Sequence, residues 1–212
     1  MNASQLVFIA STVPAMLLLS VSQAGVIVDQ QYSAGGITSQ HFPDNPGFTN
    51  QAFDDFSLDG TTDLSALTIF GVENGDPAYN TSIVMRISSS VGFEAPVLFT
   101  ATGTQVGSNL VFYLTGMQLE AGHYWLSAFV DRPLTDGGQW YWGTSSTQNG
   151  EHAMWQNPGD AFGLGSAPML TSAIVSADYD LAFKLEGAAA PAPGALALLG
   201  AVGLVGARRR RA

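Results

Sequence analysis

Histidine beside a nucleophile and an acid is the combination most often used for hydrolysis at neutral pH. The 212-residue chain has three histidines, His41, His123 and His152, and no cysteine. None lies in a hydrolase or nucleotide-binding motif, since G-x-S-x-G, H-E-x-x-H, the P-loop and G-x-G-x-x-G are all missing. We therefore expect no catalytic residues. A hydrolase with dispersed acidic catalytic residues remains a lesser alternative.

Three tryptophans form a candidate carbohydrate platform. Trp140 and Trp142 alternate with Tyr141, so on a strand both indoles share one face. Trp155 could lie beside them across a turn at Asn149-Gly150. Indole rings in a row can stack on sugars, which would make a polysaccharide a partner. The alternative is that the same face fills the protein core.

Acidic and amide side chains gather in expected loops, and such oxygen ligands suit a structural Ca²⁺ ion. No group has the spacing of an EF-hand, and surface acids also keep an exported protein soluble. No other cofactor or metal is expected. The groups are Asp44-Asn45, Asp54-Asp55 with Asp59 and Asp63, Glu73-Asn74 with Asp76, and Asp178 with Asp180.

The charge balance argues against nucleic acid as a partner. The chain has 7 basic and 17 acidic residues, and four of the basic ones form a terminal run, Arg208, Arg209, Arg210 and Arg211. The remaining body is strongly acidic and would repel phosphate.

The N-terminal segment has the pattern of a secretory signal peptide over residues 1–24. An apolar run over 6–21 is followed by small residues Ser22 and Ala24, at the −3 and −1 positions of a cut before Gly25. Residues 1–5 contain no Lys or Arg. Signal peptidase would be a partner, and the alternative is a buried N-terminal helix.

The C-terminal segment carries a second apolar stretch. Residues 194–207 have no charged or hydrogen-bonding side chain, and the cluster of four arginines over 208–211 follows directly. A helix of this length reaches about 21 Å, short of a hydrocarbon core of about 30 Å. Because arginine clusters stay on the cytoplasmic side, the body would lie outside.

The tail over residues 188–212 resembles the PEP-CTERM sorting signal of bacterial envelope proteins. The likeness rests on Pro191-Ala192-Pro193, the short apolar helix and the arginine run, with Ala192 where the family usually has Glu. It implies a transient membrane anchor, cut near the prolines by an exosortase, which is a membrane protease. The body would then reach the cell surface or extracellular matrix. A permanent tail anchor is the alternative.

The body over residues 25–187 has the alternation of a β-protein. Period-2 apolar patterns and turn residues predict nine or ten short strands, and no segment shows a capped helical stripe. We expect an antiparallel β-sandwich, jelly-roll-like or immunoglobulin-like, with a long surface loop over 156–172. The expected strands cover residues 26–31, 54–58, 64–72, 82–88, 96–104, 110–114, 123–130, 139–144, 151–155 and 181–186.

Three body segments are loosely similar to the β-sandwich ectodomains found upstream of such tails: 119–127, 139–142 and 180–187. That likeness implies no activity. The sequence thus predicts an exported, non-catalytic structural or adhesive protein of the bacterial surface or exopolysaccharide matrix. A carbohydrate-binding module is the alternative.

Overall fold

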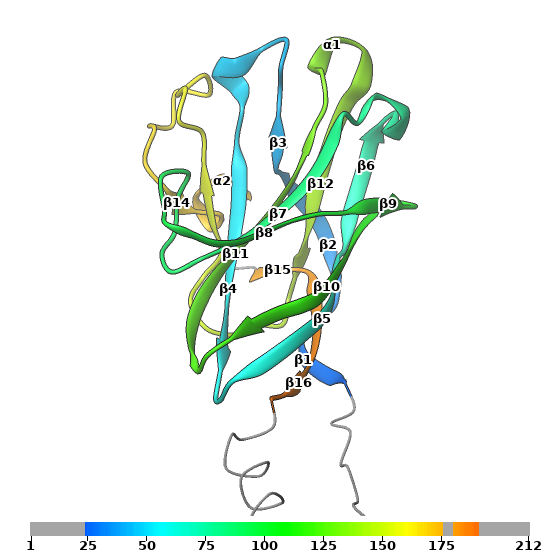
Figure 1. Ribbon diagram of the computed structural model, residues 1–212. Helices are drawn as coiled ribbons and strands as arrows, with labels where there is room; N and C mark the ends of the chain where they lie inside the picture. The colour runs from blue at the N-terminus through cyan, green and yellow to red at the C-terminus, as the bar shows by residue number, and fades with distance from the viewer. Residues whose placement is uncertain (1–23, 176–179, 191–212) are drawn as a thin grey trace, which may run out of the picture.

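The computed structural model describes residues 24–175 and 180–190, and within them the chain is built mainly from antiparallel β-strands (Figure 1). The all-β antiparallel prediction is confirmed. These residues form three hydrogen-bonded sheets. The helical elements are single turns: η1 (Pro46–Phe48), η2 (Pro77–Tyr79), α1 (Leu134–Gly137) and α2 (Ser172–Val175).

The first sheet joins the two ends of the body. Val28 on the first strand pairs with Leu185 on the last, and Leu67 pairs with both Leu185 and Phe112. These side chains are buried on one face, while alternating positions such as Tyr113 face solvent, as the period-2 pattern predicts. The strand order is β1 (Gly25–Gln30), β16 (Phe183–Ala189), β5 (Thr62–Ile69), β10 (Asn109–Leu119) and β9 (Thr104–Val106).

The second sheet is buried on both faces near its centre. Its strands β4 and β11 each contain a run of buried residues, 51–56 and 124–130. On the face away from the main core, Phe53 packs edge-on against Phe93 from a connecting loop. The order is β14 (Met169–Leu170), β13 (Met154–Gln156), β4 (Gln51–Leu58), β11 (Gly122–Asp131), β7 (Ser82–Ser88) and β8 (Val97–Thr102), with β3 (Gln40–His41) parallel to β11.

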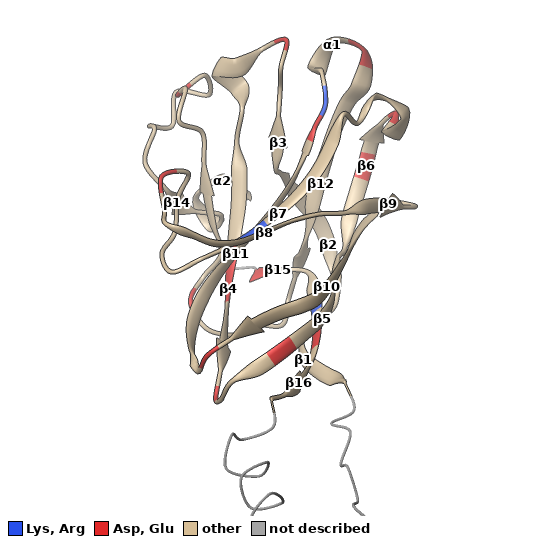
Figure 2. Ribbon diagram, viewed as in Figure 1, with Lys and Arg blue, Asp and Glu red and all other residues tan. Residues whose placement is uncertain are grey.

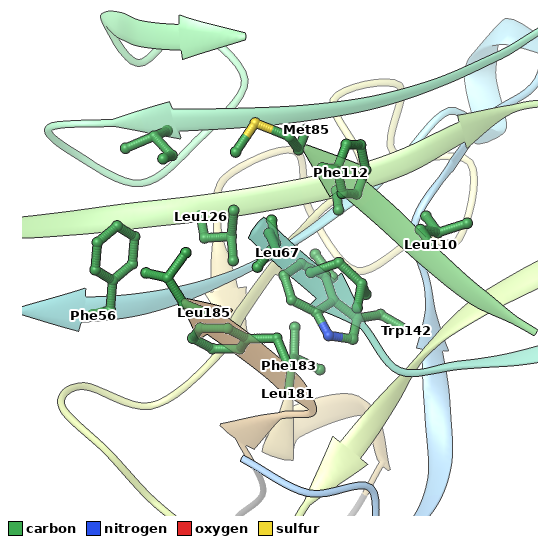
Figure 3. Packing of buried hydrophobic residues seen from close by; sticks show 14 of the residues in the cluster. Phe56, Leu67, Met85, Leu110, Phe112, Leu126, Trp142, Leu181, Phe183 and Leu185 are labelled. Carbon is green, nitrogen blue, oxygen red and sulfur yellow. The ribbon is translucent and has the colours of Figure 1, made fainter. Parts of the chain in front are cut away.

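The third sheet is centred on the tryptophan-bearing strand β12 (Gly138–Ser145). Its three partners are β2 (Ala34–Thr38), β6 (Gly71–Gly75) and β15 (Asp180–Leu181). All three sheets contribute to one hydrophobic core, in which Leu67, Leu126 and Trp142 come from different sheets (Figure 3). Burial of each such side chain stabilises the fold by about 1.5–3 kcal/mol.

Two expectations about local structure are wrong. The hairpin expected across Asn149-Gly150 does not form, because β12 and β13 belong to different sheets. The last strand also continues past Gly187: Ala188 and Ala189 pair with β5, and the Ala190 N–H donates to the Thr61 carbonyl. The expected long loop is mostly irregular, interrupted by the short strand β14.

The first and last strands lie side by side at one end of the molecule, with α1 at the other (Figure 1). Within the described part, no helix is long and apolar enough to cross a membrane. The expected signal helix and the expected apolar tail helix lie outside the described residues, so both stay predictions. The same holds for the sorting-motif residues Pro191, Ala192, Pro193, Arg208, Arg209, Arg210 and Arg211.

Candidate functional site

The expected tryptophan platform is wrong in its premise that the indoles are exposed. Trp140, Trp142 and Trp155 are 0%, 0% and 2% exposed, so no ring face is open to a sugar. Each indole N–H donates to a backbone carbonyl, Trp140 to Ser108 at 2.8 Å and Trp142 to Ala182 at 2.9 Å. This pairing lets a tryptophan bury its polar edge, and the alternative of a core role is confirmed.

Two of the acids expected to bind Ca²⁺, Asp44 and Asp76, accept backbone N–H groups. Asp44 accepts the N–H groups of Leu134 and Thr135 at 2.9 and 3.0 Å. The hydrogen bond from Leu134 is the main cause that lowers the pKa of Asp44 to about 2. Asp76 caps η2 through the Ala78 N–H at 2.9 Å. In the described residues no three His, Asp or Glu side chains are placed to hold a metal ion, and Asp178 lies outside them.

One acidic group is different, because the fold joins residues far apart in sequence. We call Gln30, Asp54, Asp55 and Asp180 the carboxylate cluster; all four are at most 1% exposed. Asp54 and Asp55 lie on β4, Gln30 ends β1 and Asp180 begins β15. The Gln30 amide Nε2 lies 3.4 Å from Asp54 Oδ2 and 3.3 Å from Asp180 Oδ2, and so bridges the two carboxyls.

The cluster binds backbone N–H groups of two other segments. Asp54 Oδ2 accepts the Leu181 N–H at 2.7 Å, and Asp180 Oδ2 accepts the Asn149 N–H at 2.7 Å. Within the described part of the chain, Asp180 Oδ1 and Gln30 Oε1 are buried without a hydrogen-bond partner.

The electrostatics of the cluster favour protonated carboxyls. Burial raises the pKa of Asp54 well above its ordinary value, and the neighbouring Asp180 raises it further. Burial is also the main cause that raises the pKa of Asp180. A carboxyl that keeps its proton costs less to bury than a carboxylate, and its O–H can serve an otherwise unpaired acceptor.

Asp55 extends the cluster towards the surface through His123. The His123 Nε2 lies 2.7 Å from Asp55 Oδ2, and the Glu151 N–H donates to Asp55 Oδ1 at 2.8 Å. Burial raises the pKa of Asp55 despite the opposing contact with His123. Only glycine fits at position 150, because its φ is +86° and a Cβ would stand 2.0 Å from Asp55 Oδ2. The contact between Asp55 and His123 therefore lies against a turn that requires glycine at position 150.

A second polar assembly surrounds a buried arginine. We call Arg132, Glu73, Asn80 and Gln105 the Arg132 network. Arg132 is fully buried and binds Glu73 through two nitrogens, at 2.6 and 2.9 Å, while its Nε donates to Asn80 at 2.7 Å. Asn80 donates to Gln105 at 2.7 Å, and Gln105 donates to Glu73 at 2.6 Å, which closes a ring.

The hydrogen bonds of the Arg132 network also favour the ionised form of Glu73. Burial alone would raise the pKa of Glu73, but hydrogen bonds from Arg132 and Gln105 hold it below its ordinary value. Glu73 therefore stays ionised to a lower pH than an ordinary glutamate, beside the guanidinium of Arg132.

The other two histidines are not part of the carboxylate cluster. His41 stacks on Phe129 with 3.9 Å between ring centroids, and its two nitrogens contact Asp131 at 3.1 Å and Gln51 at 2.7 Å. The hydrogen bond from His41 is the main cause that lowers the pKa of Asp131. His152 is exposed.

The basic residues of the body leave little positive surface. Arg132 is buried in its ring, Arg86 lies 5.1 Å from the centroid of the Phe129 ring, and Lys184 contacts Glu186 at 2.5 Å. Figure 2 accordingly shows acidic positions spread over the ribbon and few basic ones. The acidic body expected from composition is confirmed for the described residues.

Sequence reasoning missed Gln30 and three members of the Arg132 network, Arg132, Asn80 and Gln105, and it named Glu73 only as a candidate Ca²⁺ ligand. One signal was present: Asp54-Asp55 stands between Phe53 and Phe56, where two acids interrupt a strand of apolar residues. For Arg132 the sequence held a weaker indication of a special role: it is one of only three basic residues before the terminal arginine run.

Comparison with known proteins adds no family. No protein-family model matches the chain, and a search of the curated proteins found no match.

Proposed function

We propose that this chain is an exported, exosortase-sorted protein of the bacterial surface or extracellular matrix, with a structural or adhesive body that does no catalysis. Signal peptidase, an exosortase and a matrix polysaccharide would be its partners. A jelly-roll-like or immunoglobulin-like sandwich for the body belongs to the same proposal.

One observation supports the proposal most. The first strand, β1, begins at Gly25, directly after the expected signal cut, and the last strand, β16, ends at Ala189, just before Pro191. The two strands pair along their length, with Gly25 opposite Gly187. Among the described residues, the first and the last strand thus lie next to the two expected processing sites.

The polar interior also favours a structural role. The carboxylate cluster and the Arg132 network both bind backbone groups from separate segments, through Leu181 and Asn149 in one and Gly137 in the other. A fully paired buried network such as the Arg132 network makes a fold rigid and specifies one arrangement. Rigidity without disulfides suits a protein that works outside the cell and has no cysteine.

The test is the intact mass and cellular fraction of the protein in its native host, with and without the exosortase gene. We expect loss of the residues after the proline motif only when the protease is present, together with transfer to the surface or medium. A Pro193→Ala variant should reduce processing, whereas Pro158→Ala, in an exposed loop of the body, should leave it unchanged.

Two results would refute the proposal. Retention of the terminal arginine run, Arg208–Arg211, in both strains would identify a permanently anchored protein. A product that stays in the cytoplasm with residues 1–24 intact would remove the export step itself.

A further inference from the structure

We infer that a pocket between η2, β7 and the β8–β9 turn binds an uncharged, hydroxyl-rich ligand, such as the sugar units of a neutral polysaccharide. The pocket has a volume of about 380 Å³, which falls in the range of small-ligand sites. The inference goes beyond the proposed function and does not depend on how the chain is sorted.

The lining carries no charge. Five of its eight residues have a hydroxyl or amide side chain, and the other three are apolar or glycine. Polar groups of this type bind sugar hydroxyls, whereas an anionic ligand would need a cation that the lining does not provide. The lining residues are Pro77, Asn80, Thr81, Ser82, Ile83, Gly103, Thr104 and Gln105.

The two amides of the lining are held in place before any ligand arrives. Asn80 and Gln105 are both members of the Arg132 network, and Gln105 also donates to the Gly107 carbonyl at 3.0 Å. Ligand groups that meet fixed partners lose less entropy on binding. A buried ion pair directly behind the lining therefore orients the polar wall of the pocket.

Hydrogen bonding inside the protein leaves this wall rich in acceptors. Gln105 uses both amide hydrogens, on Glu73 and Gly107, and the hydroxyls of Thr81 and Ser82 donate to Asp131. The lone pairs of these hydroxyls remain, and the Gln105 carbonyl oxygen, which accepts one hydrogen bond from Asn80, keeps its second lone pair. Such a wall suits a ligand that donates several O–H groups, which is the chemistry of a polyol.

Charge around the pocket disfavours an acidic ligand. The guanidinium behind the lining, Arg132, is bound to Glu73, and the carboxylate of Asp131 lies behind Ser82. An acidic polysaccharide would meet this negative field and the acidic body around it. η2, which contributes Pro77 to the lining, packs on α1, and α1 lies at the end of the molecule away from β1 and β16 (Figure 1).

The test measures binding of defined oligosaccharides to the full chain in detergent, by saturation-transfer NMR and calorimetry. The probes are the neutral cellohexaose and maltohexaose and the acidic hexagalacturonate. We expect at least one neutral probe to bind and the acidic probe to bind at least tenfold more weakly.

Variants at Thr104, an exposed residue of the lining, locate the site. Thr104→Val removes one hydroxyl and should weaken binding about 2–10-fold, as expected for one hydrogen bond. Thr104→Trp should fill the pocket and abolish binding. The matched control is Thr115→Val, at an exposed strand position on β10, which should bind as the unmodified chain does.

The inference fails if neither neutral probe binds, if Thr104→Trp binds as well as the unmodified chain, or if the acidic probe binds more tightly. The melting temperatures of all variants should agree, because both threonines are exposed. If the melting temperature falls only in Thr104→Trp, its loss of binding reflects unfolding. The affinity of Thr104→Val then decides whether the ligand binds at this pocket. These results are independent of tail processing, so this inference and the proposed function can fail separately.

Discussion

Asp54, Asp55 and Asp180 are buried acids whose pKa values are raised in the folded protein. A group of this kind binds its proton more tightly when folded, so its stabilising effect is complete below the unfolded pKa of about 3.9 and is lost as pH rises through the folded pKa. These three residues therefore make the protein less stable as the pH increases above about 4.

Asp44, Asp131 and Glu73 act in the opposite direction. Their pKa values are lowered by hydrogen bonds, so each stabilises the fold above its unfolded pKa and loses that effect as pH falls through the folded value. The two groups of acids together place the maximum of stability in mildly acidic solution, near pH 4–5.

Asp54→Asn should flatten the alkaline side of this profile. A carboxyl that releases one proton on unfolding lowers the free energy of unfolding by about 1.4 kcal/mol for each pH unit of increase. The variant has no such proton at position 54. Near pH 4 it should be less stable than the unmodified chain by about 1–3 kcal/mol, because the amide NH₂ must face either the Leu181 N–H or the Asp55 N–H. The measurement is urea unfolding between pH 4 and 9.

The exposed Asp59 provides the control, since Asp59→Asn should keep the unmodified profile. If Asp54→Asn shows the same slope above pH 5 as the unmodified chain, the buried carboxyl does not take up a proton on folding.

Trp142→Ala should lower the free energy of unfolding by about 3–5 kcal/mol, the usual cost of removing a buried aromatic side chain. Trp142 is fully buried and lies edge-on to Phe183, at 6.4 Å between ring centroids. Urea unfolding measures the change. Tyr113→Ala, at a side chain 79% exposed, should change stability by less than about 0.5 kcal/mol. Similar values for the two variants would contradict the core role.

The sequence could not decide whether the tryptophans are buried or exposed. Alternation correctly put Trp140 and Trp142 on one face, but period 2 does not say which face is covered. The covering elements, β5, β10 and β16, come from distant parts of the chain. The buried acids are harder still, since an acid in a strand is normally read as solvent-facing.

Among the elements, the Arg132 network connects β6, the end of β11, η2 and β9 at one position. None of these contacts belongs to a strand ladder. Side-chain hydrogen bonds, rather than backbone pairing, thus fix how η2 and β9 meet the third sheet.

Arg132→Met should cost about 3 kcal/mol, because it leaves the largely buried carboxylate of Glu73 without its cation. Adding Glu73→Gln should restore part of this loss, since the unpaired charge is then gone. Chemical unfolding of the two variants measures both effects.

Arg86→Met is the matched control, because Arg86 rests on the Phe129 ring, and it should cost about 1 kcal/mol or less. If the double variant is no more stable than Arg132→Met, the unpaired carboxylate is not the cause of the loss.

The strands themselves were largely predictable. The expected segments at 82–88, 110–114 and 123–130 correspond to β7, β10 and β11, because each has a clear apolar alternation or β-branched and aromatic content. The pattern missed β2 and β3: β2 contains Gly35-Gly36, and β3 has two residues. The division into three sheets depends on pairings such as β12 with β6, which no local pattern specifies.

For the molecule as a whole, the pairing of β1 with β16 brings the two ends of the body together. Asp29 stands opposite Lys184 in this pair, on the solvent-facing side. Opposite residues of antiparallel strands have Cβ atoms about 4.5–5.5 Å apart, close enough for an engineered disulfide.

Asp29→Cys with Lys184→Cys should therefore form a disulfide on mild oxidation, and the natural chain has no other cysteine to compete. The bond should stabilise the protein by about 2–4 kcal/mol, because it restricts a long loop in the unfolded chain. Free-thiol assay and melting temperature with and without reductant measure it. Asp29→Cys with Thr115→Cys, separated by two intervening strands, should stay reduced; failure of the first pair to close would contradict the register.

The position of β16 also determines how the body would resist mechanical force. It lies between β1 and β5, so a pull on its C-terminal end runs along the strand and across two ladders of hydrogen bonds. Antiparallel bonds are perpendicular to the strands, and such a pull strains many of them together. A pull that separated Gly25 from Gly187 would instead open β1 from β16 one pair at a time. A protein tethered through its tail, and free at Gly25, would experience only the first kind of force. Flow or drag on a cell surface would then act on the fold in its more resistant direction.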